Sequence, residues 1–155
     1  MITHSEKETF DIGKKIALNL QKGDIVCLIG NLGSGKTVLT KGIAAGLGIN
    51  KDRVISPTFV LIRQHRGKNK LGLYHLDLYR LNNINDILEL GYEEYFYGDG
   101  IAVIEWADKL KCLMPKQCLK IRLSVKGKEK RIIDFTAMGS HYEKLLERLN
   151  EDIRH

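Results

Sequence analysis

The clearest chemical pattern in the sequence is a glycine-rich segment, GNLGSGKT, at 30–37. It matches G-x-x-x-x-G-K-[ST], a loop whose backbone N–H groups surround phosphate groups at the start of a helix. In this pattern Lys36 reaches the β- and γ-phosphates, and the hydroxyl of Thr37 is available to Mg²⁺. An apolar strand is predicted before the loop and a helix after it, as the pattern requires. The segment therefore predicts a nucleoside triphosphate site, and a chance glycine turn is the alternative.

The loop is rich in glycine because its backbone must come close to a ligand. Gly30, Gly33 and Gly35 allow positive φ angles and a close approach of the backbone, both of which glycine tolerates without steric cost. The N–H groups of the loop then point inward, and the dipole of the following helix favours an anion. The predicted nucleotide-binding residues of this segment are Gly30, Asn31, Leu32, Gly33, Ser34, Gly35, Lys36, Thr37 and Val38.

A magnesium-bound triphosphate needs acidic residues nearby, and two acids stand at the ends of predicted strands. Glu105 closes the apolar run IAVIE, where P-loop proteins carry a Walker-B acid. Asp77 lies inside YHLDLYRL, where an ionised carboxylate among large apolar residues needs a compensating charge or hydrogen-bond donors. Ligands of open α/β sheets bind outside the carboxyl ends of the strands. We therefore expect both acids near the phosphates, and the alternative for Asp77 is a solvated strand end.

Three other side chains are candidates for the same site. Thr58, in Ser56-Pro-Thr58, either takes the position of the switch threonine of P-loop NTPases or simply begins a strand. Trp106 is the only tryptophan, and it either docks at the site or packs in the core. His75 is a polar strand residue, a phosphate contact or a hydrogen-bond partner of Asp77. The sequence leaves these alternatives open.

The predicted elements alternate between helices and strands over the first two thirds of the chain, which indicates an α/β fold with a largely parallel sheet. Capping boxes at 5–8 and 140–143 open the first and last helices. Further helices are predicted at 36–47, with Gly48 as the C-cap, and from Asn83 or Asn85 to about 96. The last helix spans 142–153. Strands are predicted at 25–29, 58–64, 71–79, 101–105, 119–125 and 131–135.

The last two predicted strands form a hairpin with Gly127 in its turn, which adds antiparallel strands at or near an edge of the sheet. The expected fold is therefore that of a P-loop NTPase. Its mostly parallel sheet is flanked by helices and extended by antiparallel strands from the C-terminal hairpin. The length of 155 residues suggests that a single domain covers 1–155.

Composition limits the class of protein. The net charge of +6 permits an anionic partner, such as a nucleotide or RNA, without identifying one. Two basic clusters, at 66–70 and 126–131, are either solvated hairpin tips or a nucleic-acid patch. Cys27, Cys112 and Cys118 form no C-x-x-C pair and predict neither zinc nor disulfides. The N-terminus lacks an apolar signal region and no run reaches transmembrane length, so we expect a protein of the reducing cytoplasm.

Four segments in this order, GNLGSGKT, SPTFVL, YHLDLYR and IEWAD, resemble the TsaE (YjeE-type) family. These are bacterial ATPases involved in making threonylcarbamoyladenosine on tRNA. The resemblance spans about residues 9–131. The P-loop alone is generic, whereas H-x-D-x-Y-R followed by a strand that ends in E-W is far more specific.

The resemblance implies roles for the central residues. Lys36 and Thr37 correspond to the Walker lysine and the magnesium threonine, and Glu105 corresponds to the second acid of the magnesium site. Asp77 corresponds to the acid of the H-x-D motif, which is needed for hydrolysis and acts on water or on the metal. Thr58 corresponds to the switch-like threonine.

Outside the central motifs the resemblance implies three further positions. Trp106 corresponds to the aromatic residue beside the metal-site acid. Thr9 resembles a family position near the adenine. A basic residue of the C-terminal hairpin, Lys130 or Arg131, resembles one that contacts the nucleotide.

The resemblance also implies ATP and Mg²⁺ as cofactors and the TsaB–TsaD assembly as partner, with tRNA reached through that complex and no membrane. The partners perform the carbamoyl transfer, and ATP hydrolysis resets or sustains them. Arg63 and Arg80 lie in plausible regions, but nothing in the sequence aims either at the γ-phosphate. Because cationic help is worth about 10³ to 10⁵ in rate, we expect slow hydrolysis alone and faster hydrolysis with partners.

Three alternatives remain at this stage. A GTPase would need a guanine-reading N-K-x-D segment, and Asn50-Lys-Asp52 is one residue short of it. A small-molecule kinase would need a lid with several arginines, and the segment RGKNK has only one. A basic RNA-binding module with a vestigial P-loop would bind RNA in a salt-sensitive way that does not depend on Lys36.

Overall fold

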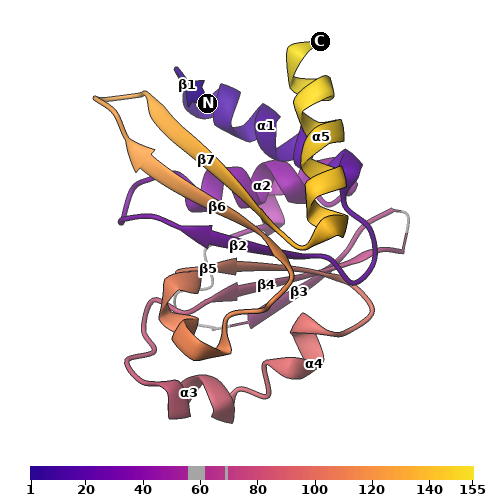
Figure 1. Cartoon of the computed structure of the whole chain (residues 1–155), viewed down its shortest axis with the longest axis vertical. Coiled ribbons are helices and arrows are strands. Elements are labelled where there is room, and N and C mark those ends of the chain that lie inside the picture. Colours follow the sequence, from indigo (N-terminus) through magenta and orange to yellow (C-terminus); the bar gives the residue numbers. More distant parts are fainter. Residues whose placement is uncertain (56–61, 69) are drawn as a thin grey trace.

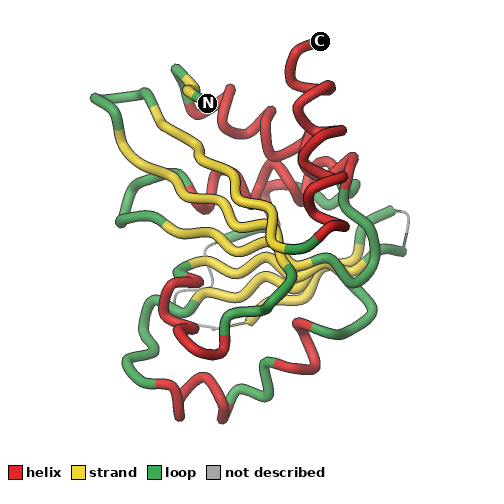
Figure 2. The backbone as a smooth tube through the Cα atoms, viewed as in Figure 1, coloured by secondary structure: helices red, strands yellow, loops and turns green. Residues whose placement is uncertain are grey.

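The computed structural model describes residues 1–55, 62–68 and 70–155, and their strands form one seven-stranded sheet (Figures 1 and 2). The strands lie in the order β1-β7-β6-β2-β5-β4-β3. Their bounds are β1 Ile2–Thr3, β2 Ile25–Ile29, β3 Ile62–Arg66, β4 Gly72–Asp77, β5 Ile101–Glu105, β6 Cys118–Val125 and β7 Arg131–Met138.

The centre of the sheet is parallel and its edges are antiparallel. β6, β2, β5 and β4 run in one direction, whereas β7, β1 and β3 pair antiparallel to their neighbours. β2 and β5 are buried along their whole length, as expected for parallel strands covered on both faces. The predicted α/β class, the parallel centre and the antiparallel C-terminal hairpin are therefore confirmed.

Helices cover both faces of the sheet (Figure 1). The helical segments are α1 Glu6–Asn19, α2 Lys36–Gly46, α3 Ile84–Glu89, α4 Glu93–Phe96 and α5 Ser140–Arg154, with short 3₁₀ turns η1 Lys51–Arg53 and η2 Ala107–Leu113. One core joins Val26 and Leu28 to α1, α2 and α5, and the other joins Cys27 and Ile104 to α3, α4 and η2. Among the described helices, none has both the length and the apolar composition needed to cross a membrane.

The predicted helix ends are partly confirmed. Ser5 caps α1, since its hydroxyl oxygen accepts the N–H of Glu8 at 3.1 Å, while the Glu8 carboxylate accepts the N–H of His4. After α2, Gly48 adopts φ 77°, and the N–H of Ile49 reaches the carbonyl of Ala44, which is the pattern of a Schellman cap.

Two predicted helix boundaries are wrong. The expected helix from Asn83 to about 96 is two short helices, because Gly91 adopts φ 64° between them, although Asn83 does cap α3. The expected capping box at Ser140 does not form. Ser140 is already the first helical residue, and the preceding Gly139 has no side chain that could accept a hydrogen bond.

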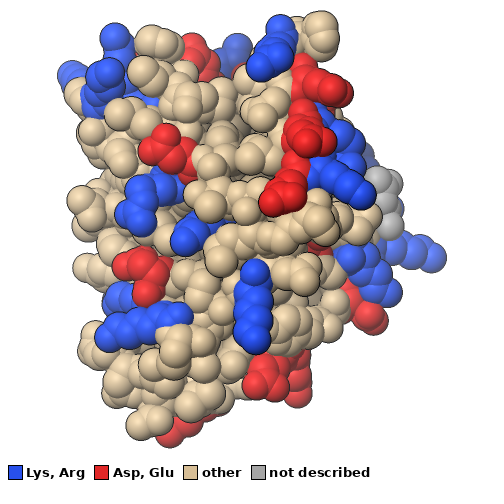
Figure 3. Space-filling view, viewed as in Figure 1, with Lys and Arg blue, Asp and Glu red and all other residues tan. Residues whose placement is uncertain are grey.

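The two basic clusters of the sequence lie at opposite ends of the sheet. Arg66, Lys68 and Lys70 of the first cluster lie between or at the ends of β3 and β4, and the other cluster forms the exposed tip of the β6–β7 hairpin (Figure 1). On the face shown in Figure 3, Lys and Arg side chains are interspersed with acidic and uncharged ones, and acidic residues gather over α5. The clusters therefore do not merge into one basic surface.

Glycines bring α1 and α2 into close contact. A Cβ atom added at Gly42 would lie 2.1 Å from the carbonyl oxygen of Phe10, and one at Gly13 would lie 2.4 Å from that of Leu39. Because these neighbours are backbone atoms, a side chain cannot be accommodated by a rotamer change. The contact matters for the rest of the molecule because α1 lies against the helix that follows the P-loop.

We predict that Gly42→Ala lowers the free energy of unfolding by about 1–3 kcal/mol, since the two helices must separate to admit the methyl group. Alanine favours a helix over glycine by about 1 kcal/mol, so any loss is opposed by propensity. Thermal and urea unfolding measure the change. Asn150→Ala, on the exposed side of α5, is the control and should be neutral or slightly stabilising. A Gly42→Ala protein at least as stable as wild type would contradict the close-contact account.

Candidate functional site

A cleft of about 250 Å³ opens at the carboxyl ends of the parallel strands. Four parts of the chain surround it: the start of α1, the loop between β2 and α2, the ends of β4 and β5, and the β6–β7 hairpin. The residues that line it are Glu6, Thr9, Leu32, Gly33, Gly35, Lys36, Thr37, Val38, Asp77, Tyr79, Glu105, Trp106, Glu129 and Arg131. Most of the predicted site residues therefore meet in one place.

The loop at 30–35 has the backbone that its glycines predict, with one difference. Gly33 and Gly35 adopt φ 78° and 103°, in the left-handed region that favours glycine. Gly30 does not have a positive φ. It serves the other expected use of glycine, close approach, because a Cβ there would lie 2.5 Å from both the Leu123 carbonyl oxygen and the Ser34 hydroxyl.

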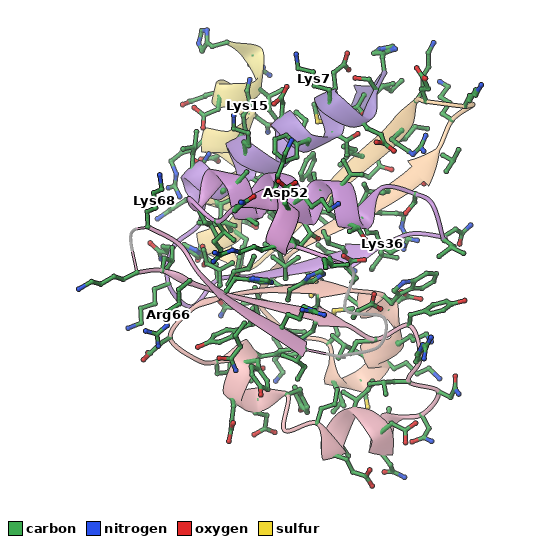
Figure 4. All side chains as sticks on the ribbon, turned by 180° about the vertical axis from the view of Figure 1, so that it is seen from behind. Lys7, Lys15, Lys36, Asp52, Arg66 and Lys68 are labelled. Carbon is green, nitrogen blue, oxygen red and sulfur yellow. The ribbon has the colours of Figure 1, made fainter. Side chains whose placement is uncertain are left out.

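Lys36 sits at the start of α2 with its ammonium group folded over the loop. Its Nζ donates to the carbonyl oxygens of Gly30 at 2.6 Å and Asn31 at 2.9 Å. It also lies 4.1 Å from the centre of the Trp106 ring, a cation–π distance. Figure 4 shows Lys36 at the end of the sheet opposite to Arg66 and Lys68.

The surroundings of Lys36 act on its charge in two ways. Burial lowers the pKa of Lys36 from its ordinary value. The negative charges of Glu105, Asp77 and Asp108 act in the opposite direction and favour the ammonium form. The cleft thus holds a desolvated cation beside two buried carboxylates.

The two predicted acids lie side by side. Asp77 and Glu105 are paired residues of the adjacent parallel strands β4 and β5, at the carboxyl end of each. They are only 3% and 2% exposed, which excludes the alternative of a solvated Asp77. The Asp77 carboxylate accepts the backbone N–H of Tyr79 at 2.9 Å, so a turn after the strand helps to orient it.

Thr37 and Glu105 provide oxygen atoms of the kind that Mg²⁺ binds. The Thr37 hydroxyl lies 3.2 Å from each oxygen of the Glu105 carboxylate. A hydroxyl that donates its proton to a carboxylate keeps its lone pairs for a cation. Within the described ranges no cluster of three or more His, Cys, Asp or Glu could enclose a metal. A hydroxyl and two acids fit Mg²⁺, which takes its remaining ligands from phosphates and water.

His75 lies below the cleft and contacts Glu105. Its ring is fully buried, and Nε2 lies 2.8 Å from the Glu105 carboxylate oxygen Oε1. The sequence offered three interpretations of His75: a polar strand residue, a phosphate contact or a partner of Asp77. The observed partner is Glu105, and His75 is not among the residues that line the cleft.

Trp106 combines the two roles that the sequence left open. It packs against one hydrophobic core and also lines the cleft, with its ring 4.9 Å from that of Tyr79. Its backbone adopts φ 58°, which is uncommon for a large residue. Because Trp106 follows Glu105 directly, this bend places the ring beside Lys36 at the end of β5.

Of the two basic hairpin residues that could contact the nucleotide, only Arg131 lies at the cleft. Arg131 lines the cleft, and its guanidinium donates to the carbonyl of Gly33 at 3.3 Å, whereas Lys130 is exposed and is not among the lining residues. Thr9 lines the cleft, and its hydroxyl pairs with that of Thr3 at 2.8 Å. Thr58 lies outside the described residues.

Sequence reasoning missed three lining residues: Glu6, Tyr79 and Glu129. A signal for Tyr79 was present, since it lies two residues after Asp77 and shares its face in an extended chain. Glu6 and Glu129 gave no local signal, because they reach the cleft only through the packing of α1 and the hairpin.

Two observations bear on the alternative functions. The Asn50 side chain accepts the N–H of Asp52 and caps η1, so this segment has a structural role. In a GTPase an N-K-x-D segment would instead contact the guanine base. Arg66 and Lys68 of the segment RGKNK lie at the end of the sheet opposite to Lys36 (Figure 4), and neither Arg63 nor Arg80 is among the lining residues of the cleft.

Several known proteins are similar to this chain in sequence and in structure. The family model for the threonylcarbamoyl adenosine biosynthesis protein TsaE matches residues 3–133. The chain is 41% identical over 148 residues to the tRNA threonylcarbamoyladenosine biosynthesis protein TsaE of Bacillus subtilis (strain 168), a match that covers 96% of this chain and 91% of the relative. It is 38% identical over 124 residues to the protein of the same name from Treponema pallidum (strain Nichols), covering 80% and 90%.

Among solved structures, the crystal structure of Bacillus subtilis YdiB superposes with a TM-score of 0.81 and 37% sequence identity. This superposition covers 99% of this chain and 94% of the other. The fold is that of a P-loop NTPase, and the chain belongs to the TsaE family of tRNA threonylcarbamoyladenosine biosynthesis proteins.

Proposed function

We propose that this protein binds ATP with Mg²⁺ in the cleft and hydrolyses it to support a TsaB–TsaD complex that modifies tRNA. The observation that carries the proposal is the meeting of Lys36, Thr37, Asp77 and Glu105 in one cleft at a helix N-terminus. Such a site stabilises a triphosphate through backbone N–H groups, a lysine and a metal. The name of its relatives, tRNA threonylcarbamoyladenosine biosynthesis protein TsaE, supplies the link to tRNA modification.

The chain's own residues divide the work of binding. The loop at 30–35 presents N–H groups, and Lys36 must leave the carbonyls of Gly30 and Asn31 to reach the phosphates. Thr37 and Glu105 would hold Mg²⁺, which when bound draws charge from the β- and γ-phosphate oxygens. Thr9 and Arg131 lie along the wall at Gly33 and Gly35, where the nucleoside end of ATP would contact the protein.

Asp77 has the position needed to act on the attacking water. It lies beside Glu105, and its oxygen Oδ1 accepts the N–H of Tyr79, whereas the Glu105 carboxylate faces the Thr37 hydroxyl. A buried carboxylate next to the metal-site acid can orient a water molecule or accept its proton. No arginine that lines the cleft is assigned to the γ-phosphate, so partner proteins would supply a positive charge there.

Lys36→Ala should lower the affinity for ATP by about 100-fold or more, because it removes a charge-assisted contact to two phosphates. Isothermal titration calorimetry with a non-hydrolysable ATP analogue measures this loss. Lys22→Ala, an exposed lysine paired with Asp99, is the matched control and should bind like wild type. Tight ATP binding by the Lys36→Ala protein would refute the assignment of the phosphate site.

Asp77→Asn should keep ATP affinity within a few-fold and lower turnover by about 10² or more, the range of a lost acid–base residue. Asparagine keeps an oxygen that accepts the N–H of Tyr79, so the turn after β4 is retained. Phosphate release and analogue binding are measured on the same preparation. Equal losses in binding and in turnover would instead indicate a role in holding the nucleotide.

We expect the isolated protein to hydrolyse ATP slowly and the rate to rise when TsaB and TsaD are added. The physical reason is the lack of an assigned arginine at the γ-phosphate, whose contribution is about 10³ to 10⁵ in rate in related chemistry. Phosphate release is followed with the protein alone, with each partner and with both. A rate unchanged by both partners would contradict this part of the proposal, while a phosphorylated small molecule as product would point to a kinase.

A further inference from the structure

On the side away from the cleft, the Glu105 carboxylate is in contact with other side chains of the protein. Its carboxylate is 2% exposed and lies at the end of the fully buried strand β5. Its oxygen Oε1 faces His75 Nε2 at 2.8 Å and the Thr40 hydroxyl at 3.4 Å. Because the Thr40 hydroxyl is closer to the Lys36 carbonyl, at 2.9 Å, His75 is the stronger of these two contacts.

The other side of the carboxylate faces the cleft. The Thr37 hydroxyl is equally distant from both oxygens, and Lys36 and Trp106 complete the wall. His75 itself does not line the cleft, so it cannot touch a nucleotide there without a rearrangement. Glu105 therefore stands between a buried histidine and the predicted metal.

Packing alone does not favour a histidine at position 75, because burying its polar ring costs free energy. Its ring is buried on the same face of β4 as Leu73, a core residue, and it pairs in register with Val103 of β5. Its second nitrogen, Nδ1, is buried without a hydrogen-bond partner. A leucine would fill such a site without leaving a polar atom unpaired. The contact with Glu105 is what a leucine could not provide.

We propose that His75 is a positioning residue that holds Glu105 in its metal-binding orientation. In this arrangement Nε2–H donates to Oε1, and Nδ1 is the unprotonated nitrogen, which is the less costly one to leave unpaired. The carboxylate then cannot rotate away from Thr37, and its remaining acceptor capacity is directed at the cation. This inference rests on the proposed function, since the cation is the Mg²⁺ that accompanies ATP.

The first test is the affinity for Mg²⁺ of the protein saturated with a non-hydrolysable ATP analogue. His75→Leu should weaken Mg²⁺ binding about 10- to 100-fold, the usual effect of removing an outer partner of a metal ligand. His75→Gln, which keeps an N–H donor, should recover part of that loss. A merely structural role predicts no such recovery and no selective effect on the metal.

The matched control is His65→Leu. His65 lies on the adjacent strand β3 and also has a buried unpaired ring nitrogen, but it makes no contact with Glu105. This variant should bind Mg²⁺ like wild type. If a folded His75→Leu protein binds Mg²⁺ as tightly as wild type, the proposal is overturned. If wild type itself shows no Mg²⁺-dependent binding, the proposed function fails first and this inference falls with it.

The second test uses the wild-type protein and does not depend on whether a variant folds. Nitrogen-15 spectra of the histidine rings identify which nitrogen of His75 carries a proton, with the signal assigned by its loss in His75→Gln. Protonated Nε2 beside a carboxylate is the expected result. An unprotonated Nε2 would place a lone pair against Glu105 and would overturn the proposal.

Discussion

The parallel pairing of β4 with β5 is the constraint on which the site depends. Parallel strands bring their carboxyl ends to the same edge of the sheet, so the last residues of the two strands become neighbours. Here those residues are Asp77 and Glu105. The same edge receives the loop after β2, because β2 runs parallel to β5 with Leu28 opposite Glu105. A shift of one residue in the β4–β5 register would put Asp77 and Glu105 on opposite faces of the sheet.

Two buried carboxylates side by side repel each other, and the surrounding groups offset that repulsion. An uncompensated buried charge costs several kcal/mol. Asp77 receives a backbone N–H, Glu105 receives a hydroxyl and an imidazole, and the Lys36 ammonium balances part of the negative charge. These compensating groups come from α2, from β4 and from the turn that follows β4, whereas β5 supplies Glu105 itself. The site is thus stable only when β4, β5 and α2 are packed together, which couples its chemistry to the fold.

Much of this arrangement could be predicted from the sequence, because its signals are local. The glycines at 33 and 35, the lysine after them and the acids that close apolar runs each carry their meaning within a few residues. The apolar runs themselves predicted buried parallel strands. By contrast, the sequence does not decide which use of glycine applies at Gly30, conformational freedom or small size, because only the position of Leu123 distinguishes them. The helix break at Gly91 and the helix start after Gly139 were predicted wrongly for a similar reason, since each depends on the backbone angle of a single glycine.

The partners of the site could not be predicted, because they are set by contacts between distant segments. Asp77, two residues along the same strand, was one of the partners that the sequence offered for His75. The observed partner, Glu105, lies diagonally across the β4–β5 ladder, since His75 pairs with Val103 and Asp77 pairs with Glu105. The pairing and register of the two strands decide this contact. Likewise Glu6 and Thr9 reach the cleft because glycines let α1 lie directly on α2, and Arg131 reaches it because the hairpin extends past the end of β2. Sequence patterns identify the residues that do chemistry, and the packing of distant elements decides which of them hold one another in place.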